Sequence, residues 1–451
     1  MASKYLPQTP DDIRQMLDTI GAKSTNDLYA DIPESLTLKG EYNIPSALSE
    51  DEIRRQLNEL GKKNQQLICF AGAGAYDHYT PAVIPYITQR SEFLTSYTPY
   101  QAEISQGTLQ YIFEYQTLMA DLSGMDISNA SMYDGATATA EAMMMAIHSA
   151  RKKNRVLISS ALNPAVIRVV ETYAKYHGVD ITLVPATNGQ TDKAFIADAL
   201  NSGDVAGVIV GQPNYFGIVE DLSSLADTCH AQKALLIINA PASTLAALKT
   251  PGEWGADIAV GDAQSLGLPL SFGGPYLGYM CTKESLVRKM PGRIVGGTTD
   301  HDGHRTFVLT MQAREQHIRR QKATSNICSN QGVMTLMVTI YMALMGPEGL
   351  KEVNEQSYGG AHYLYESLIN SGLCRPAFPD APFFNEFVVV FTKDVDKIQK
   401  RLLDNGILGG VKPASADGTA PAGLENALMF AVTEQRTKAE IDKLVSIIKE
   451  A

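Results

Sequence analysis

The sequence lacks the long apolar runs that mark membrane and secreted proteins. None of its apolar runs approaches the roughly 18 to 20 residues of a membrane-spanning helix. The longest, at 332–346, is flanked by polar residues. The N-terminus has no apolar stretch of signal-peptide length. These absences predict a protein with no membrane segment and no secretion signal.

Cysteine is scarce and shows no pairing pattern. The five cysteines are odd in number, widely spaced and without a CxxC pair: Cys69, Cys229, Cys281, Cys328 and Cys374. We expect reduced thiols, several of them in the core. Reduced thiols are typical of a reducing compartment, so the sequence predicts a cytoplasmic location.

Basic residues are too few for a surface that binds nucleic acid. The chain has 38 Lys and Arg against 49 Asp and Glu, a net charge of -11. This balance argues against nucleic acid or an anionic membrane as the main partner. The 451 residues are 45% hydrophobic and 19% charged, which is typical of a soluble globular protein. A chain of this length can bury a large core without disulfides or metals.

Six apolar, β-rich runs occur between residues 65 and 315, and amphipathic or Asp-initiated helices separate the first five. The runs are 156–160, 181–186, 205–211, 234–239, 257–262 and 276–282. Near-continuous apolar strands separated by helices predict an α/β domain with a mostly parallel sheet covered on both faces. Two further helices, at 107–124 and 137–153, are expected before the first strand.

The pattern predicts three regions. Residues 1–64 form a helical and extended segment, with helices beginning after Thr9 and Ser49. Residues 65–328 form the large α/β domain. Residues 329–451 contain a small α+β domain of strand, helix, strand and helix. Among several possible identities, this is the architecture of the aminotransferase-like (type I) pyridoxal-phosphate enzymes.

The best candidate for a phosphate site is the start of the helix near residue 135. The chain has no GxxxxGK[ST] motif, and prolines follow the glycines at 71–76, which disfavours a dinucleotide site. Gly135, Ala136 and Thr137 enter a helix whose N–H groups could attract phosphate. An ordinary Thr-capped helix fits the same residues. Asp134 favours the ordinary helix, because its carboxylate would repel a dianion.

No lysine stands where a Schiff-base enzyme of this architecture requires one. That lysine should follow the strand at 257–262, yet none occurs between Lys249 and Lys283. Lys249 precedes the strand, and Lys283 lies beyond the next one. The sequence therefore has the frame of a pyridoxal-phosphate enzyme without its nucleophile, unless the frame is misassigned.

Other catalytic and metal motifs are absent. The sequence has no GxSxG and no HExxH. His301 and His304 form a loose pair in a Gly-rich segment, which is more typical of a solvated loop than of a metal site. We therefore expect no metal.

Two polar segments are candidate sites. Residues 96–107 contain Tyr97, Tyr100, Glu103 and Gln106, and they fit a pocket lining or a simple loop before a helix. Residues 314–332 place four cationic side chains just before Thr324 and Ser325. That segment fits an anion site or a solvated basic helix end.

Several long blocks carry a family resemblance, of which the most specific are TPYQAEISQG and REQHIRRQKATSN. The others include FAGAGAYDHYTPAVIPYI, YDGATATAEA, GDAQSLGLPLSFGGPYLGYM and MPGRIVGG. Together they resemble the glycine cleavage system P-protein over essentially the whole chain. Within that family the chain is similar to subunit 1 of the split bacterial form of glycine dehydrogenase (decarboxylating).

The resemblance implies a heterotetramer of two plus two subunits with the aminotransferase-like fold. It implies that pyridoxal 5'-phosphate is bound covalently to a lysine of subunit 2. This agrees with Gln264 and Ser265 near the expected lysine position. The implied reaction decarboxylates glycine and transfers the aminomethyl group to the lipoyl arm of H-protein.

The resemblance also suggests that this chain completes the active site of its partner. On that interpretation Tyr97, Tyr100, Glu103 and Gln106 line the pocket, and Thr324 and Ser325 donate hydroxyls to the partner's cofactor phosphate. Two alternatives stay open. The chain could be a non-catalytic scaffold that stabilises the partner or docks H-protein, or a self-sufficient enzyme that uses Lys249 or Lys283.

Overall fold

A computed structural model describes residues 5–40, 42–94, 96–150 and 152–450. The chain divides into two compact units, Met1–Gln65 and Gln66–Ala451, and each is described by itself. The C-terminal region that the sequence delimits at residue 329 belongs to the second unit.

The first unit holds two capped helices. They are α1 (Pro10–Ile20) and α2 (Glu50–Gly61), with the short 3-10 helices η1 (Thr25–Tyr29) and η2 (Glu34–Leu36) between them. The Thr9 hydroxyl accepts a hydrogen bond from the Asp12 N–H, and the Asp12 carboxylate accepts one from the Thr9 N–H. Ser49 and Glu52 form the same reciprocal pair at α2. The predicted N-caps are therefore confirmed.

The second unit is built on a sheet that has seven strands within the described residues. Their order is β2-β10-β9-β8-β7-β3-β4. The strands are β2 (Ile127–Ser128), β3 (Arg155–Ser159), β4 (Asp180–Val184), β7 (Val205–Gly211), β8 (Leu235–Asn239), β9 (Ile258–Asp262) and β10 (Gly278–Thr282). Strands β4, β3, β7, β8 and β9 pair in parallel, whereas β10 is antiparallel to β9 and to β2. All six predicted strands are confirmed to within one or two residues.

Helices cover both faces of this sheet. Ile158 and its neighbours on one face pack with α5 (Gly135–Ser149) and α6 (Pro164–His177). Leu157, one residue earlier, points to the opposite face and packs with α7 (Lys193–Leu200) and α8 (Leu225–Ala231). Successive strand residues face opposite sides, so the continuous apolar runs supply both layers. Only the 3-10 helix η5 (Ala242–Ala246) lies between β8 and β9, where we expected an α-helix.

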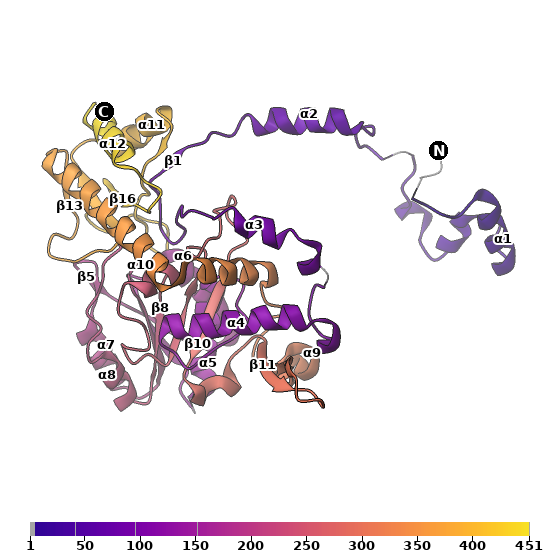
Figure 1. Cartoon of the computed structure of the whole chain (residues 1–451), viewed down its shortest axis with the longest axis horizontal. Helices are drawn as coiled ribbons and strands as arrows, with labels where there is room; N and C mark the ends of the chain where they lie inside the picture. Colours follow the sequence, from indigo (N-terminus) through magenta and orange to yellow (C-terminus); the bar gives the residue numbers. More distant parts are fainter. Residues whose placement is uncertain (1–4, 41, 95, 151, 451) are drawn as a thin grey trace. The chain divides into compact units, whose positions relative to one another are not determined.

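The β2–β10 end of the sheet is covered by two long helices. Helices α4 (Gln106–Ser123) and α10 (Gly332–Asn370) pack against each other, as Figure 1 shows. Further short elements of this unit are α3 (Val83–Thr88), η3 (Ser91–Phe93), η4 (Ala102–Ile104), β5 (Ala186–Thr187), β6 (Gln190–Thr191), η6 (Glu284–Lys289), η7 (Gln312–Arg314), α9 (Gln316–Arg319) and η8 (Arg320–Lys322).

A hairpin of β11 (Ile294–Thr299) and β12 (Arg305–Thr310) packs beside α4. The sequence analysis did not predict these strands, because the glycines and threonines of β11 give no apolar signal. The segment with His301 and His304 is the exposed turn of this hairpin.

The small α+β region has its own core. Its sheet, in the order β13-β14-β16, comprises β13 (Cys374–Pro376), β14 (Glu386–Phe391) and β16 (Ala427–Ala431). Helices α11 (Val395–Asp404) and α12 (Lys438–Glu450) contribute to that core. Strand β15 (Ile407–Leu408) pairs in parallel with β1 (Ile68–Cys69), so the start of the unit joins its C-terminal region. The predicted order of strand, helix, strand and helix is confirmed.

Helix α10 is long and apolar enough to cross a membrane by length and composition, although the sequence analysis judged the run at 332–346 too short. The helix is broken at Gly346, where φ is 59° and ψ is -176°, immediately before Pro347. Val338 and Tyr341 of its first half are buried in the protein core. A single such helix is weak evidence for a membrane span, because core helices pass the same test.

Gly217 controls how closely the small sheet approaches the large one. Its carbonyl accepts a hydrogen bond from the Phe384 N–H, and a Cβ at Gly217 would overlap the backbone of Glu386. Its φ of 80° also favours glycine. We predict that Gly217→Ala lowers the free energy of unfolding by about 3 kcal/mol in urea titration.

The control for this prediction is Gly203→Ala. Gly203 has φ of 77° and nothing within 4 Å of its would-be Cβ. We expect that variant to lose only about 1 kcal/mol. Equal losses for the two variants would show that the close approach at Gly217 is unimportant.

Candidate functional site

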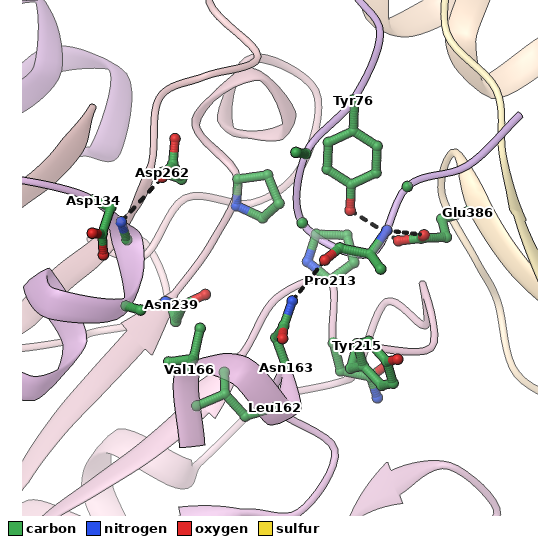
Figure 2. A pocket seen from close by; sticks show the side chains of 18 of the residues that line it. Tyr76, Asp134, Leu162, Asn163, Val166, Pro213, Tyr215, Asn239, Asp262 and Glu386 are labelled. Atoms are coloured by element: carbon green, nitrogen blue, oxygen red, sulfur yellow. Dashed lines mark hydrogen bonds between the residues drawn. The ribbon is translucent and has the colours of Figure 1, made fainter. Parts of the chain in front are cut away.

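A cavity of about 300 Å³ lies at the carboxyl ends of the central parallel strands. Asn239 ends β8 and Asp262 ends β9, and Pro213 follows β7. Ligands of open α/β sheets bind at this edge. Figure 2 shows the cavity, which is lined by Gly72, Ala73, Gly74, Ala75, Tyr76, Asp134, Gly135, Ala136, Leu162, Asn163, Val166, Pro213, Asn214, Tyr215, Asn239, Pro241, Asp262, Tyr276 and Glu386.

Two carboxylates already occupy the N-terminus of α5. The Asp134 side chain accepts a hydrogen bond from the Thr137 N–H at 2.8 Å, and Asp262 Oδ2 accepts one from the Gly135 N–H at 3.1 Å. Gly135 and Ala136 line the cavity, whereas Thr137 completes a capping box with Asp134. Burial raises the pKa of Asp262 to about 7. Two of the N–H groups of the candidate phosphate cup are therefore already bonded to carboxylates.

Gln264 stands near the position where the sequence pattern predicts the cofactor lysine, and the residue is 1% exposed. Its amide nitrogen donates to the carbonyls of Tyr76, at 2.9 Å, and Leu268, at 2.8 Å. Its amide oxygen accepts the Tyr76 N–H at 2.8 Å. Both ends of the amide are therefore bonded to backbone groups.

The two lysines on either side of this position, Lys249 and Lys283, make contacts elsewhere. Lys249 lies over the ring of Trp254, 3.9 Å from its centroid. Lys283 Nζ lies 2.8 Å from Asp257 Oδ1 and also donates to the Gly255 carbonyl. Neither lines the cavity. A self-sufficient enzyme built on either lysine finds no support in this geometry.

The opposite wall of the cavity joins residues about 310 positions apart. Glu386, at the start of β14, accepts hydrogen bonds from the Ala73 N–H at 2.7 Å and the Tyr76 hydroxyl at 2.9 Å. Burial raises the pKa of Glu386 to about 7. Asn163 donates to the Ala73 carbonyl at 2.8 Å. The contact between Glu386 and the loop at 72–76 was not predicted, because nothing local in the sequence links the two.

These residues do not fit pyridoxal phosphate. Within the described residues that line the cavity there is no lysine, arginine or histidine. A phosphate at the start of α5 would meet the carboxylates of Asp134 and Asp262. The end of β8 offers the neutral Asn239, whose amide nitrogen donates to Thr139 at 2.8 Å, where a carboxylate would face a pyridine nitrogen.

The two polar segments of the sequence lie next to each other. The Tyr97 hydroxyl is 3.1 Å from Ser329 Oγ, although the Tyr97 side chain is 87% exposed. The Tyr100 hydroxyl accepts a hydrogen bond from Arg293 Nη2 at 3.1 Å, and the Tyr100 ring contacts the ring of His317 edge-on. We call the side chains of Tyr97, Tyr100, Glu103 and His317 the polar face.

The remaining members of the first segment differ in exposure. Glu103 is exposed. The Gln106 amide donates to the carbonyls of Ala102 and Phe307 and accepts the Phe307 N–H at 2.9 Å. Gln106 therefore fastens the polar segment to β12.

Arg293 supports the polar face through its contacts with the Tyr100 side chain. Its side chain is 3% exposed, and its Nε lies 3.8 Å from Glu315 Oε2. Within the described residues, Nε and Nη1 have no hydrogen-bond acceptor. The guanidinium also lies against the Tyr100 ring, 5.3 Å from its centroid. Tyr100 thus rests on a buried cation.

Thr324 and Ser325 line a second cavity of about 240 Å³, together with His148 and His177. The Ser325 hydroxyl donates to Glu141 Oε1 at 2.8 Å. Burial raises the pKa of Glu141 to about 7. The Ser325 hydroxyl is therefore held inside this chain.

Metal-ligand groups are sparse. Within the described residues, one group of three, Asp300, Asp302 and His304, brings its ligand atoms within 4.8 Å of one another. All three are exposed on the hairpin turn, and exposed acidic groups are common without an ion. The five cysteines are free, and Cys229, Cys281 and Cys374 are buried, as predicted.

The raised pKa of Glu386 predicts a pH dependence of stability. Folding raises the pKa of the Glu386 carboxyl from 4.5 to about 7, so the protonated carboxyl favours the folded state. This contribution to stability is fully present below pH 4.5. That stability is lost as pH rises to 7, and it is on the order of 3 kcal/mol. We expect Glu386→Gln to reduce the decline in unfolding free energy between pH 5 and pH 7.5, measured by urea titration.

Glu284→Gln is the matched control, because Glu284 is exposed. That variant should decline with pH as the parent does. A Glu386→Gln variant with the slope of the parent would contradict the proton uptake assigned to this carboxyl.

Known proteins resemble this chain along its whole length. The family model for the glycine cleavage system P-protein matches residues 3–448. A probable glycine dehydrogenase (decarboxylating) subunit 1 of Anoxybacillus flavithermus is 48% identical, covering 99% of this chain and 98% of the relative. The protein of the same name from Moorella thermoacetica is also 48% identical, covering 99% of both chains.

Comparison with solved structures identifies the same family. The crystal structure of an inhibitor-bound glycine decarboxylase (P-protein) of the glycine cleavage system superposes with a TM-score of 0.90. It is 40% identical and covers 99% of this chain and 100% of its own. A glutamate decarboxylase of Lactobacillus brevis, 13% identical with a TM-score of 0.69, shares the fold alone. The expected type I pyridoxal-phosphate-enzyme fold is confirmed, and the chain belongs to the glycine cleavage system P-protein family.

Proposed function

We propose that this chain is the lysine-lacking subunit of a heteromeric glycine dehydrogenase (aminomethyl-transferring). With a lysine-bearing partner it decarboxylates glycine and passes the aminomethyl group to the lipoyl arm of H-protein. The relatives with 48% identity are named as subunit 1 of a glycine dehydrogenase, which supports the existence of a second subunit. A heterotetramer of two plus two subunits fits this proposal.

The observation that carries the proposal is the position of Gln264. Its buried amide is committed to Tyr76 and Leu268, so the chain offers no lysine at the end of β9. Carboxylates fill the phosphate position in the same cavity. Pyridoxal phosphate, which supplies the electron sink for loss of carbon dioxide, therefore belongs on the partner.

The polar face is the part of this chain that we assign to the partner's active site. Tyr97 and Tyr100 are 87% and 58% exposed, yet each is held by a defined bond, to Ser329 and Arg293. Exposed tyrosines on a fixed base are typical of surfaces that bind other molecules. Their hydroxyls would position substrate groups, and Glu103 would bind or move a proton beside them.

Thr324 and Ser325 fit a supporting role. Ser325 is bonded to Glu141, so donation to the partner's cofactor phosphate would exchange that bond for another. The neighbouring cations Arg320 and Lys322 would favour an anion here. A cytoplasmic location is part of the same proposal and is supported by the free cysteines.

Reconstitution tests whether the cofactor lysine is supplied by the partner subunit and not by this chain. We expect the purified chain, mixed with pyridoxal phosphate, to show no visible absorption band from a lysine-bound cofactor. Exchange of bicarbonate with the glycine carboxyl group should need the lysine-bearing subunit and H-protein together with this chain. A borohydride-reducible band from the isolated chain would mean that one of its own lysines is catalytic.

Variants of the polar face separate a site-completing subunit from a scaffold. In the reconstituted complex, Tyr97→Phe should lower the exchange rate about tenfold, because one hydrogen bond to a bound ligand is lost. The assembled complex should keep its mass in analytical ultracentrifugation. Tyr176→Phe, at another exposed tyrosine, is the control.

Glu103→Gln and Tyr100→Phe extend the same series and should also lower the rate without changing assembly. If none of the three variants alters the exchange rate, the polar face does not line the active site. The scaffold interpretation would then be favoured.

A further inference from the structure

Most side-chain hydrogen-bond donors that line the cavity at the start of α5 are already engaged within the protein. The Tyr76 hydroxyl donates to Glu386 and the Tyr276 hydroxyl to the Leu270 carbonyl. The lining asparagine side chains also donate within the protein, from Asn163 to Ala73, from Asn214 to Gly189 and Glu220, and from Asn239 to Thr139. Among the described side chains of the lining, the Tyr215 hydroxyl and the second amide hydrogens of Asn163 and Asn239 have no defined acceptor.

Acceptors remain in excess on the same lining. Both oxygens of Asp262 accept one bond each, from the Gln264 and Gly135 N–H groups. Both oxygens of Glu386 likewise accept one bond each, from Ala73 and Tyr76. A carboxylate can accept about four hydrogen bonds, so these two groups and Asp134 keep free lone pairs.

The charge of the lining has one sign. Asp134, Asp262 and Glu386 face the cavity, and none of its described lining residues is lysine, arginine or histidine. Figure 2 shows Asp134 and Asp262 on one side and Glu386 with Tyr76 on the other. A cation in the cavity would stabilise the ionised forms of Asp262 and Glu386, whose pKa values burial has raised to about 7.

The apolar part of the lining distinguishes between kinds of cation. Leu162, Val166, Pro213 and Pro241 also line the cavity. A hard metal ion such as Ca²⁺ or Mg²⁺ makes no use of such groups, because it is bound by oxygen ligands. An alkyl chain would contact them, and an ammonium group supplies three donors and no acceptor.

We propose that this cavity binds a small organic ammonium ion and rejects anions, the phosphate of pyridoxal phosphate included. The ligand class is a primary aliphatic amine that carries no carboxylate or phosphate. The fold's anion-binding position has thus become a cation-binding position in this chain. This inference concerns the chain by itself and does not depend on the proposed partner.

The test is isothermal titration of the full-length chain with two probes of matched size. Propylammonium chloride should bind with one site per chain at constant ionic strength. Sodium propionate, which has the same number of carbon atoms and the opposite charge, should give no binding, and inorganic phosphate should give none. Equal binding of propionate and propylammonium, or no binding of propylammonium, would overturn the proposal.

Variants locate the binding site. Asp262→Asn should weaken propylammonium binding about tenfold or more, because a charged hydrogen bond is lost. Asp302→Asn removes the same charge from the exposed hairpin turn and should leave the affinity unchanged. Asp134→Asn serves if Asp262→Asn does not fold, since asparagine caps a helix as well as aspartate does.

Circular dichroism melts of each variant establish that it is folded before titration. If the folded cavity variants bind propylammonium as tightly as the Asp302→Asn control, the amine binds elsewhere and the proposal is wrong.

Discussion

The buried side chain of Gln264 is the interaction on which the cavity depends. Its amide accepts from the Tyr76 N–H and donates to the Tyr76 and Leu268 carbonyls, so one side chain satisfies three backbone groups. A lysine at this position has donors and no acceptor. It would leave the Tyr76 N–H unsatisfied in a buried site, at about 1 to 3 kcal/mol. The buried amide of Gln264 therefore holds Tyr76, at the end of the loop at 72–76.

That loop in turn connects the small sheet to the large one. Ala73 and Tyr76 both bond to Glu386 at the start of β14. Strand β1 continues the connection by pairing with β15, and Gly217 allows the close approach of Glu386 from the other side. The cavity is thus enclosed by three distant parts of the chain. Its wall is acidic because the hydrogen bonds that join these parts are accepted by the carboxylates of Glu386 and Asp262.

The inner cavity and the polar face are built from different residues of this chain. The inner cavity lies at the carboxyl edge of the parallel strands and is lined by three carboxylates, Asp134, Asp262 and Glu386. The polar face carries exposed tyrosines on a buried arginine, with no cavity of its own assigned to them. Under the proposed function, in which the chain lends groups to a partner's active site, its own cavity needs no anion site.

The strands of the main sheet and the absence of a lysine after the strand at 257–262 could both be predicted from the sequence alone. Continuous apolar runs such as 205–211 identify buried strands, and the interval from Lys249 to Lys283 is visible without coordinates. The hairpin of β11 and β12 was missed, because IVGGTT lacks the apolar pattern of a buried strand. The polar pattern of residues 96–107 pointed to Tyr97 and Tyr100, and the family resemblance added their role in the partner's pocket.

The tertiary structure decided which of these residues meet. The sequence suggested a Thr cap for α5, whereas the N-cap is Asp134. The approach of Asp262 to Gly135 and of Glu386 to Tyr76 depends on contacts across about 130 and 310 residues. Local sequence determines helix caps and strand periodicity because those interactions span a few residues. The charge of the cavity and the meeting of Tyr97 with Ser329 were decided only by tertiary structure, because strand order and domain packing bring distant residues together.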